Sequence, residues 1–360
     1  MPASASLVTP RPACYTGPMR YRFLILAGLI CGGLLGYYML WSHLSDQIAA
    51  QAQAWMESQR KLGREVSYGA MRQWGFPYRL SLTFENVRWR DPNSAAAWDI
   101  QADDITAHLQ LWNPDHVIFV LTGRQQIGWK DGAAQLHVAL TAENFRASAV
   151  FDAAGKWQRL AADLHQARLE DAGQALSAAR LNLHARRAET VPPSSDLAIQ
   201  AEGLILPPQA SLPDGGPLGR EIARLDLIGT LRGTVFGKTP QERLANWRDG
   251  GGVIDFETIG LQWGALKLKG NGTLTLDKLF RPLGAMSSQV YGADAGIDAL
   301  AAAGRMKADE AAAAKAVLMA IAKRDETGER YLQVPLTAQD GRLFLGPVAL
   351  FGLPPIWPAQ

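Results

Sequence analysis

Histidine and carboxylate side chains can act as acid–base catalysts or metal ligands, so their spacing is the first test for chemistry. The sequence contains six histidines, which are His43, His108, His116, His137, His165 and His184. None of them has the spacing of a His-Glu-x-x-His zinc site. Asp104 and His108 share the polar face of an alternating segment, about 13 Å apart at about 3.3 Å per residue. That separation is too large for a shared metal, so we expect solvated side chains and no metal or cofactor.

Motifs for covalent catalysis and for phosphate binding are also missing. The sequence has no Gly-x-Ser-x-Gly nucleophile elbow. The glycines at 250–252 are not followed by the Lys-Ser/Thr pair that completes a phosphate-binding loop. We therefore expect a protein that is not an enzyme.

Tryptophan is abundant, with 11 residues in a chain of 360. Those in the region of predicted strands are Trp74, Trp89, Trp98, Trp112, Trp129, Trp157 and Trp263. They fit a core built from large side chains. They fit equally an apolar sheet face that protein covers only in part, which would leave a groove for an apolar ligand. The sequence leaves both interpretations open.

The elements that would position these side chains begin with an apolar segment at residues 23–41, which contains no charged residue. As a helix it spans about 28 Å at about 1.5 Å per residue, close to the thickness of a bilayer core. The membrane-anchoring residues are Phe23, Leu24, Leu26, Leu29, Leu34, Leu35, Tyr37, Tyr38 and Trp41. Arg11, Arg20 and Arg22 precede the segment, and the first charge after it is Asp46. The positive-inside rule then predicts a single-pass anchor with a cytoplasmic N-terminus.

A cleaved signal peptide is the alternative to an anchor. The apolar run is longer than a signal peptide needs, and the nearest small-x-small site, Ala50-Gln51-Ala52, lies well past the run. Ile30 stands where a lipoprotein signal before Cys31 needs a small residue. We expect an uncleaved anchor, preceded by a disordered cytoplasmic leader at residues 1–22. Either Met1 or Met19 is the start.

A helical stalk is predicted at residues 42–63, where Leu44, Ile48, Trp55 and Met56 recur near a 3.6-residue period and Gly63 provides a stop. Residues 64–360 form the predicted β-rich domain. We expect one elongated, curled antiparallel sheet, with two lobes that would meet near residues 190–220.

Strands are predicted from apolar residues that alternate with polar ones. The alternating sets include Tyr78/Leu80/Leu82/Phe84, Ile105/Ala107/Leu109/Leu111, Leu136/Val138/Leu140, Phe145/Ala147/Ala149/Phe151, Leu181/Leu183, Leu197/Ile199, Leu225/Leu227, Val334/Leu336 and Leu343/Leu345. Each set gives a strand one apolar face and one polar face, as in antiparallel sheets covered on one side. The pattern predicts a mostly β fold.

Three other local patterns predict a turn or a helix. Gly270-Asn271-Gly272 separates strand-like residues 261–269 from residues 273–277, which predicts a hairpin with a type I′ turn. Thr239-Pro240-Gln241-Glu242 is a capping box, which predicts a helix at about 239–248. An alanine-rich stretch predicts helix at about 290–323, broken near Gly304. The apolar tail, residues 347–360, is predicted either to pack on the sheet or to plug one end of it.

The net charge of +2 excludes the strongly basic surface typical of nucleic-acid binders, so no nucleic-acid partner is expected. Only 19% of the residues are charged, which excludes a disordered acidic protein. The two cysteines both precede residue 32, so the predicted β domain needs no disulfide.

The sequence resembles an uncharacterised proteobacterial family of inner-membrane-anchored periplasmic proteins, classed as a domain of unknown function. The segments that carry the resemblance are Trp74-Gly75-Phe76-Pro77-Tyr78-Arg79, residues 260–277 and residues 334–347. The architecture is more distantly similar to AsmA-type envelope proteins, which join one N-terminal anchor to a curled sheet with an apolar interior. This likeness implies a role in the cell envelope and contact with phospholipid. Neither family supplies catalytic residues.

Three hypotheses follow. The first is a periplasmic protein, tethered to the bacterial inner membrane, that binds or shields a phospholipid or other apolar ligand in its sheet. The second is a scaffold with a closed core that recruits an envelope partner protein through its loops or tail. The third is a hydrolase, which would require convergent polar groups in a pocket. No ligand-binding residue can be assigned from the sequence.

Overall fold

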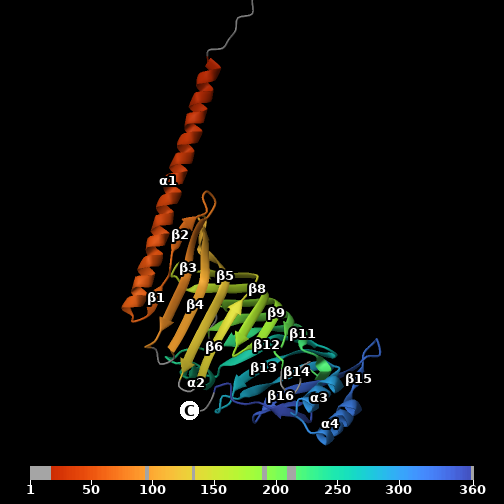
Figure 1. The fold of residues 1–360 in the computed structure, drawn as a ribbon. Coiled ribbons are helices and arrows are strands. Elements are labelled where there is room, and N and C mark those ends of the chain that lie inside the picture. Colours follow the sequence, from red (N-terminus) through yellow and green to blue (C-terminus); the bar gives the residue numbers. More distant parts are fainter. Residues whose placement is uncertain (1–17, 94–96, 132–133, 189–192, 209–215, 358–360) are drawn as a thin grey trace, which may run out of the picture.

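The protein is mostly β, as its computed structural model shows for residues 18–93, 97–131, 134–188, 193–208 and 216–357. One antiparallel sheet of 18 strands forms the body, and a long helix projects from it (Figure 1). The helical elements are α1 (Pro18–Lys61), η1 (Gly216–Leu218), α2 (Pro240–Asp249), α3 (Ala293–Ala302) and α4 (Ala308–Ile321). The strands are β1 (Glu65–Ser67), β2 (Met71–Trp74), β3 (Leu80–Asp91), β4 (Ala97–Gln110), β5 (Asn113–Asp131), β6 (Ala134–Thr141), β7 (Asn144–Phe151), β8 (Trp157–Asp171), β9 (Gln174–Ala188), β10 (Ser194–Ile205), β11 (Glu221–Arg232), β12 (Val253–Trp263), β13 (Leu266–Leu276), β14 (Pro282–Tyr291), β15 (Lys323–Arg324), β16 (Arg330–Gln339), β17 (Arg342–Leu345) and β18 (Val348–Gly352). The predicted fold class is confirmed.

Backbone pairing follows chain order almost throughout, because short turns join antiparallel neighbours. β1 and β2 both pair with β3, and β4 and β5 follow. β6 and β7 both lie between β5 and β8, and each pairs with a different part of these two long strands. The order then continues from β8 to β14, β16, β17 and β18, with β15 beside β16. Because β10 pairs along its length with both β9 and β11, the sheet does not divide into the two lobes predicted near residues 190–220.

Helix α1 joins the predicted span and the predicted stalk in one element of 44 residues. It is long and apolar enough to cross a membrane. It ends at Lys61, and Gly63 follows at φ +82°, as the predicted stop requires. Residues 18–22 are helical, so the prediction of a disordered leader is wrong for them, and residues 1–17 lie outside the described part. The buried stripe of the stalk consists of Trp41, Ser45, Ala49, Met56 and Gln59.

The two faces of the sheet differ in chemistry. Residues paired across neighbouring strands form apolar rows, such as Ala162–Leu183–Ile199–Leu227–Ile259 from β8 to β12. The alternate residues carry charge and pair across strands, as Arg180 does with Asp163 and Arg186 with Asp196. We call the apolar side the inner face. The predicted one-sided strands are confirmed with two exceptions: Tyr78 lies before β3 and is exposed, and Leu111 lies in the turn after β4.

A crease crosses the sheet, and there the alternation changes phase. Leu164 and Ala167 are both buried although they lie three positions apart in β8. Between them Gln166 has φ +49°, and the register places it opposite Ala179, which in turn faces Gly203 at φ +57°. In β8 and in β10, one residue in the left-handed region lets the strand keep its apolar side chains on the same face while it bends.

The predicted hairpin at Gly270-Asn271-Gly272 is wrong. Residues 266–276 form the uninterrupted strand β13, and the turn falls at Gly264 and Ala265, with Gly264 at φ +54°. The strand glycines have a different role: a Cβ on Gly270 would lie 2.6 Å from the Ser287 carbonyl oxygen. Glycine therefore permits close backbone approach within the sheet instead of forming its turn.

The helix predictions are largely confirmed. α2 begins at Pro240, its N-cap Thr239 accepts a hydrogen bond from the Glu242 amide, and Gly250 follows its end. The alanine-rich stretch forms α3 and α4, which are separated at Gly304 with φ +67°. The predicted start at residue 290 is too early because β14 continues to Tyr291, where pairing with β13 and β16 holds the backbone extended.

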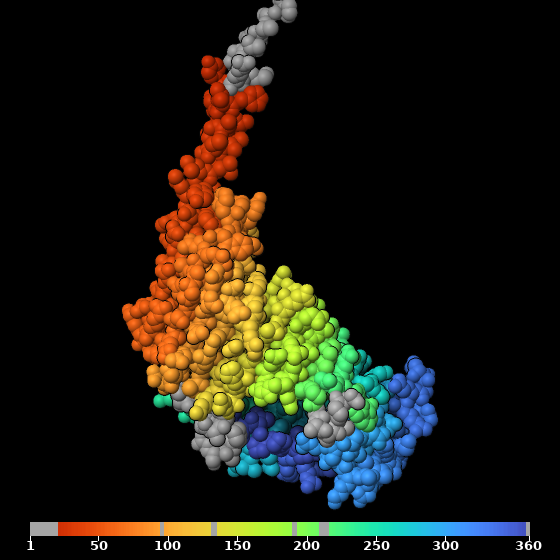
Figure 2. Space-filling view, viewed as in Figure 1, coloured from red at the N-terminus to blue at the C-terminus, as the bar shows by residue number. Residues whose placement is uncertain are grey.

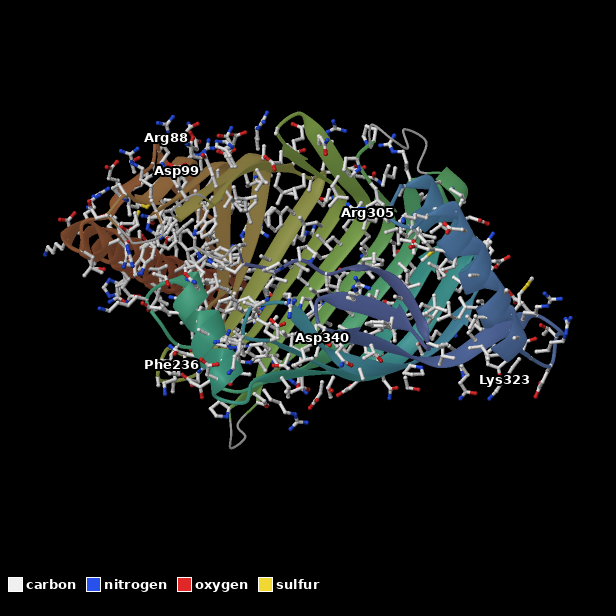
Figure 3. The ribbon with its side chains drawn as sticks, turned by 90° about the horizontal axis from the view of Figure 1, so that it is seen from below. Arg88, Asp99, Phe236, Arg305, Lys323 and Asp340 are labelled. Atoms are coloured by element: carbon white, nitrogen blue, oxygen red, sulfur yellow. The ribbon has the colours of Figure 1, made fainter. Side chains whose placement is uncertain are left out.

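The sheet curls so that its inner face closes on itself. Strands β16–β18, near the label of Asp340 in Figure 3, lie across the inner side of the earlier strands. The tail continues from β18, where the Ile356 amide donates to the Phe280 carbonyl, and the Trp357 ring meets Trp129 of β5 at 5.2 Å. The space-filling view is hollowed where the yellow and green strands approach these C-terminal strands (Figure 2).

Candidate functional site

The candidate site is the inner face itself, which we call the trough. Five large aliphatic side chains on this face remain 37–43% exposed. They are Ile127 of β5, Leu136 of β6, Leu160 of β8, Leu183 of β9 and Ile199 of β10. Leu183 and Ile199 are direct cross-strand neighbours, and Leu136 lies opposite Trp129. Leu160, Leu183 and Ile199 lie on one side of the crease at Gln166, and Ile127 and Leu136 lie on the other, so the described chain leaves two apolar groups of the inner face partly uncovered.

A cavity of about 400 Å³ opens on the same face, under helix α3. Strands β12 and β13 contribute Leu261, Trp263 and Leu268 to its wall. Ile297 of α3 and Leu345 of β17 line the opposite side. Among the described lining residues one is charged, namely Arg220, whose Nε and Nη2 donate to the Leu206 carbonyl at 2.9 and 2.7 Å.

Three elements limit the trough. α3 contacts η1 and packs over the ends of β13 and β14, where Ile297 is buried against Val290 and Leu332. The tail closes part of the opposite side through the contact between Trp357 and Trp129. The stalk of α1 covers the first strands, with its Trp55 ring 5.3 Å from Trp89 of β3. The prediction that the tail packs on the sheet is confirmed.

The comparisons with known proteins bear on most of this architecture. A family of uncharacterized proteins conserved in bacteria, DUF2125, matches residues 41–354. The chain belongs to the DUF2125 family. The match confirms the resemblance to a domain of unknown function, whereas the likeness to AsmA-type proteins is not confirmed. No curated protein and no solved structure matches the chain.

The matched DUF2125 region begins at Trp41, where the predicted span ends. Most of the predicted anchor residues before it are exposed, from Tyr38 at 50% to Leu29 at 69%, whereas Tyr37 is half-buried. Trp41 is the more buried of the two predicted anchor residues that bind the β domain: it is only 9% exposed and its indole donates to the Arg79 carbonyl at 3.0 Å, while the Tyr37 hydroxyl donates to the Pro77 carbonyl.

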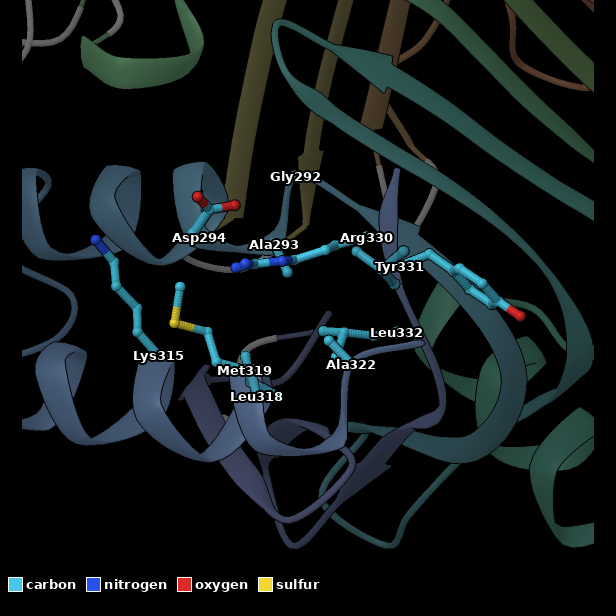
Figure 4. A pocket seen from close by; sticks show the side chains of 11 residues that line it. Gly292, Ala293, Asp294, Lys315, Leu318, Met319, Ala322, Arg330, Tyr331 and Leu332 are labelled. Carbon is cyan, nitrogen blue, oxygen red and sulfur yellow. The ribbon is translucent and has the colours of Figure 1, made fainter. Parts of the chain in front are cut away.

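A second, smaller pocket of the DUF2125 domain lies between α3, α4 and β16 (Figure 4). Its volume is about 80 Å³, and Asp294, Lys315, Met319 and Arg330 are among its lining residues. This volume holds a few water molecules and no lipid-sized ligand. We assign it no function.

Catalytic groups do not converge in the described residues of the DUF2125 domain. They contain no group of three or more His, Cys, Asp or Glu side chains able to hold a metal ion. Ser81 Oγ and His108 Nδ1 are 2.8 Å apart, but Ser81 is 0% exposed and no substrate can reach it. Desolvation and the neighbouring Arg79 guanidinium lower the pKa of His108.

Asp104 and His108 share one face, as predicted, but the prediction of a solvated side chain is wrong for His108, which is half-buried. Asp104 lies opposite Glu85, and His108 lies opposite Ser81, on the outer face of β4. The sequence analysis missed the partners of His108, because Ser81 and the Trp74 ring, at 5.6 Å, approach from other strands. It also missed Gly237-Lys238-Thr239 before α2, which resembles the end of a phosphate-binding loop. There the Lys238 amide donates to the Glu242 carboxylate, so the helix start is already capped.

The outer face is strongly polar. Side-chain hydrogen bonds lower the pKa of Asp226, chiefly from Arg224, and that of Asp196, chiefly from Arg186. These surface pairs contribute little to stability. They do keep the outer face hydrated, which leaves the trough as the apolar surface available for binding.

Proposed function

We propose that this protein is a non-enzymatic, membrane-anchored component of the bacterial cell envelope that holds the acyl chains of a phospholipid in its trough. The observation that carries the proposal is that five half-exposed aliphatic side chains, in two groups, share the inner face with a cavity of about 400 Å³. Burying apolar surface is favourable by about 25 cal/mol per Å², so such a surface gains free energy when an apolar ligand covers it.

The shape of the site supports a chain-like ligand. The exposed residues lie at two levels of the inner face, with Ile127 and Leu136 at one and Leu160, Leu183 and Ile199 at the other, and the cavity lies farther along the same curled face. A long, flexible apolar molecule can follow such a path, whereas a compact ligand would use only the cavity. The small number of polar groups in the cavity wall favours hydrocarbon over a sugar or a nucleotide.

The anchor supports a role at a membrane. We propose that α1 is uncleaved, spans the inner membrane with its N-terminus in the cytoplasm, and leaves the sheet in the periplasm. Ala49 is buried in the helix stripe that packs on the sheet, next to the only small-x-small site considered for a signal peptidase. The helix continues through this site and packs on β1–β3, so cleavage there would remove part of the fold, which supports an uncleaved anchor.

The experiment is to purify the full chain in a mild detergent, wash it extensively, and measure bound phospholipid by native mass spectrometry. Leu300 of α3 lines the cavity, so Leu300→Trp should fill it and displace lipid. Val317 lies on α4, outside the cavity and 42% exposed, so Val317→Trp is the matched control.

We expect bound phospholipid in the unmodified protein and in Val317→Trp, with a clear loss in Leu300→Trp. Equal retention in both variants would mean that the lipid surrounds α1 and not the trough. A protein free of lipid would refute the proposal and favour a scaffold that recruits a partner protein.

A further inference from the structure

A loop beside the membrane-spanning segment carries exposed aromatic side chains that the proposed function does not use. It comprises residues 74–79, between β2 and β3, and Figure 1 shows this end of the sheet next to the middle of α1. Phe76 packs among three aromatic residues of α1. Its ring centroid is 5.8 Å from Tyr37, 5.4 Å from Tyr38 and 5.6 Å from Trp41.

Hydrogen bonds fix the height of this loop along the helix. The Tyr37 hydroxyl donates to the Pro77 carbonyl, and the Trp41 indole donates to the Arg79 carbonyl. Tyr37 and Trp41 lie about one turn, or 5.4 Å, apart. Two anchoring points on successive turns prevent the loop from sliding along the helix.

The level of the loop matches the boundary between hydrocarbon and headgroups. The uncharged segment 23–41 spans about 28 Å, so its last turn lies at the end of the bilayer core. The loop is bound to this last turn. Any orientation of α1 across the membrane therefore carries the loop to the headgroup layer.

The exposed aromatic side chains of this region suit that layer. Tyr78 is 76% exposed and Phe76 is 43% exposed. Leu80 pairs with Leu109, which places the β4–β5 turn beside the loop, and Trp112 in this turn is 67% exposed. Tyrosine and tryptophan concentrate at membrane interfaces because one end of the ring is apolar and the other forms hydrogen bonds.

We propose that Phe76 and Tyr78, together with Trp112, form a second membrane contact that enters the phospholipid headgroup layer next to α1. This contact would hold the β1–β3 edge of the sheet at the bilayer surface, so that the sheet does not swing freely on a single helix. The inference does not rest on a lipid in the trough. A protein partner for these aromatic residues is the alternative.

The test uses an environment-sensitive dye on single cysteines in the full chain. Cys14→Ala and Cys31→Ala remove the native thiols, and Tyr78→Cys or Trp112→Cys then carries the dye. Phe236→Cys is the matched control, because Phe236 is 58% exposed and lies near α2, away from the loop (Figures 1 and 3). The labelled proteins are reconstituted in vesicles of phosphatidylcholine and phosphatidylglycerol, with and without a nitroxide near the headgroup.

We expect blue-shifted emission that the nitroxide quenches at positions 78 and 112, and water-like, unquenched emission at position 236. Emission at position 78 that equals the control would overturn the proposal. A blue shift at position 78 without nitroxide quenching would also overturn it, because the dye would then be covered by protein instead of lipid.

Discussion

Replacing two exposed trough residues should weaken lipid binding by an amount that their exposure predicts. Leu183 and Ile199 are paired across β9 and β10 and are 37% and 42% exposed. Full burial of such a side chain is worth about 1.5–3 kcal/mol, so the uncovered share is roughly 0.6–1.2 kcal/mol per residue. The double variant Leu183→Ser/Ile199→Ser should therefore bind lipid about 7- to 50-fold more weakly, since about 1.4 kcal/mol corresponds to a factor of ten.

The control variant must lose a similar amount of stability while its substitutions lie outside the trough. Val317 and Ile321 lie one turn apart on α4 and are 42% and 40% exposed, so Val317→Ser/Ile321→Ser removes a similar buried share. The assay is a titration of each full-length protein, in one detergent, with a phospholipid that carries a dansyl group on an acyl chain. Energy transfer from the native tryptophans reports binding. Equal affinity of the two double variants would refute the assignment of the trough as the binding surface.

Three further changes test parts of the fold. Trp357→Ala should lower the melting temperature of the full chain in detergent. The edge-to-face contact of Trp357 with Trp129 contributes about 0.5–1.5 kcal/mol, in addition to the free energy from burying its apolar surface. An unchanged melting temperature would support a free tail that recruits a partner. The pKa of His108 is lowered in the fold, so the unfolded chain binds the proton more readily and the protein loses stability as the pH falls below the ordinary histidine pKa of 6.5. His108→Gln should therefore reduce the dependence of stability on pH in this range. Melting temperatures measured across the range test this, and an unchanged pH dependence would contradict it. Gly264→Val should lower the free energy of unfolding in urea by more than about 1 kcal/mol, because φ is +54° and the new Cβ would lie 2.8 Å from the Leu218 carbonyl oxygen. An unchanged free energy of unfolding would contradict a turn at Gly264 and favour the turn predicted at Asn271.

The strands and the helix caps could be predicted because each depends on neighbouring residues. Alternation in residues such as Leu181/Leu183 directly encodes which face of a strand is apolar. Thr239, Pro240 and Glu242 carry a complete capping signal within four positions. The span at 23–41 depends on length and composition alone. These features do not need the rest of the fold to be known.

The hairpin error shows where local signals fail. Asn271 and Gly272 satisfy the turn rule, yet both lie within β13, which pairs with β12 and with β14 on either side. The true turn at Gly264 lacks asparagine, and it lies against the backbone of Leu218 in η1, which is far away in the sequence. Tertiary pairing thus overrides a strong local preference. The crease at Gln166 escaped prediction for the same reason, because it depends on Gly203 two strands away.

The trough itself could be predicted only as an alternative, because exposure depends on how far the sheet curls. The places where the trough is left uncovered support the proposal that it binds a ligand. An open sheet is most vulnerable at its edges, and here both are protected: α1 packs on β1–β3, and the tail crosses back from β18 until Trp357 reaches Trp129. The uncovered aliphatic residues lie instead in the middle strands, from Ile127 in β5 to Ile199 in β10. A chain that covers its edges and leaves the centre of its apolar face open retains a surface that a guest molecule can occupy and leave, and this is the arrangement that lipid binding requires.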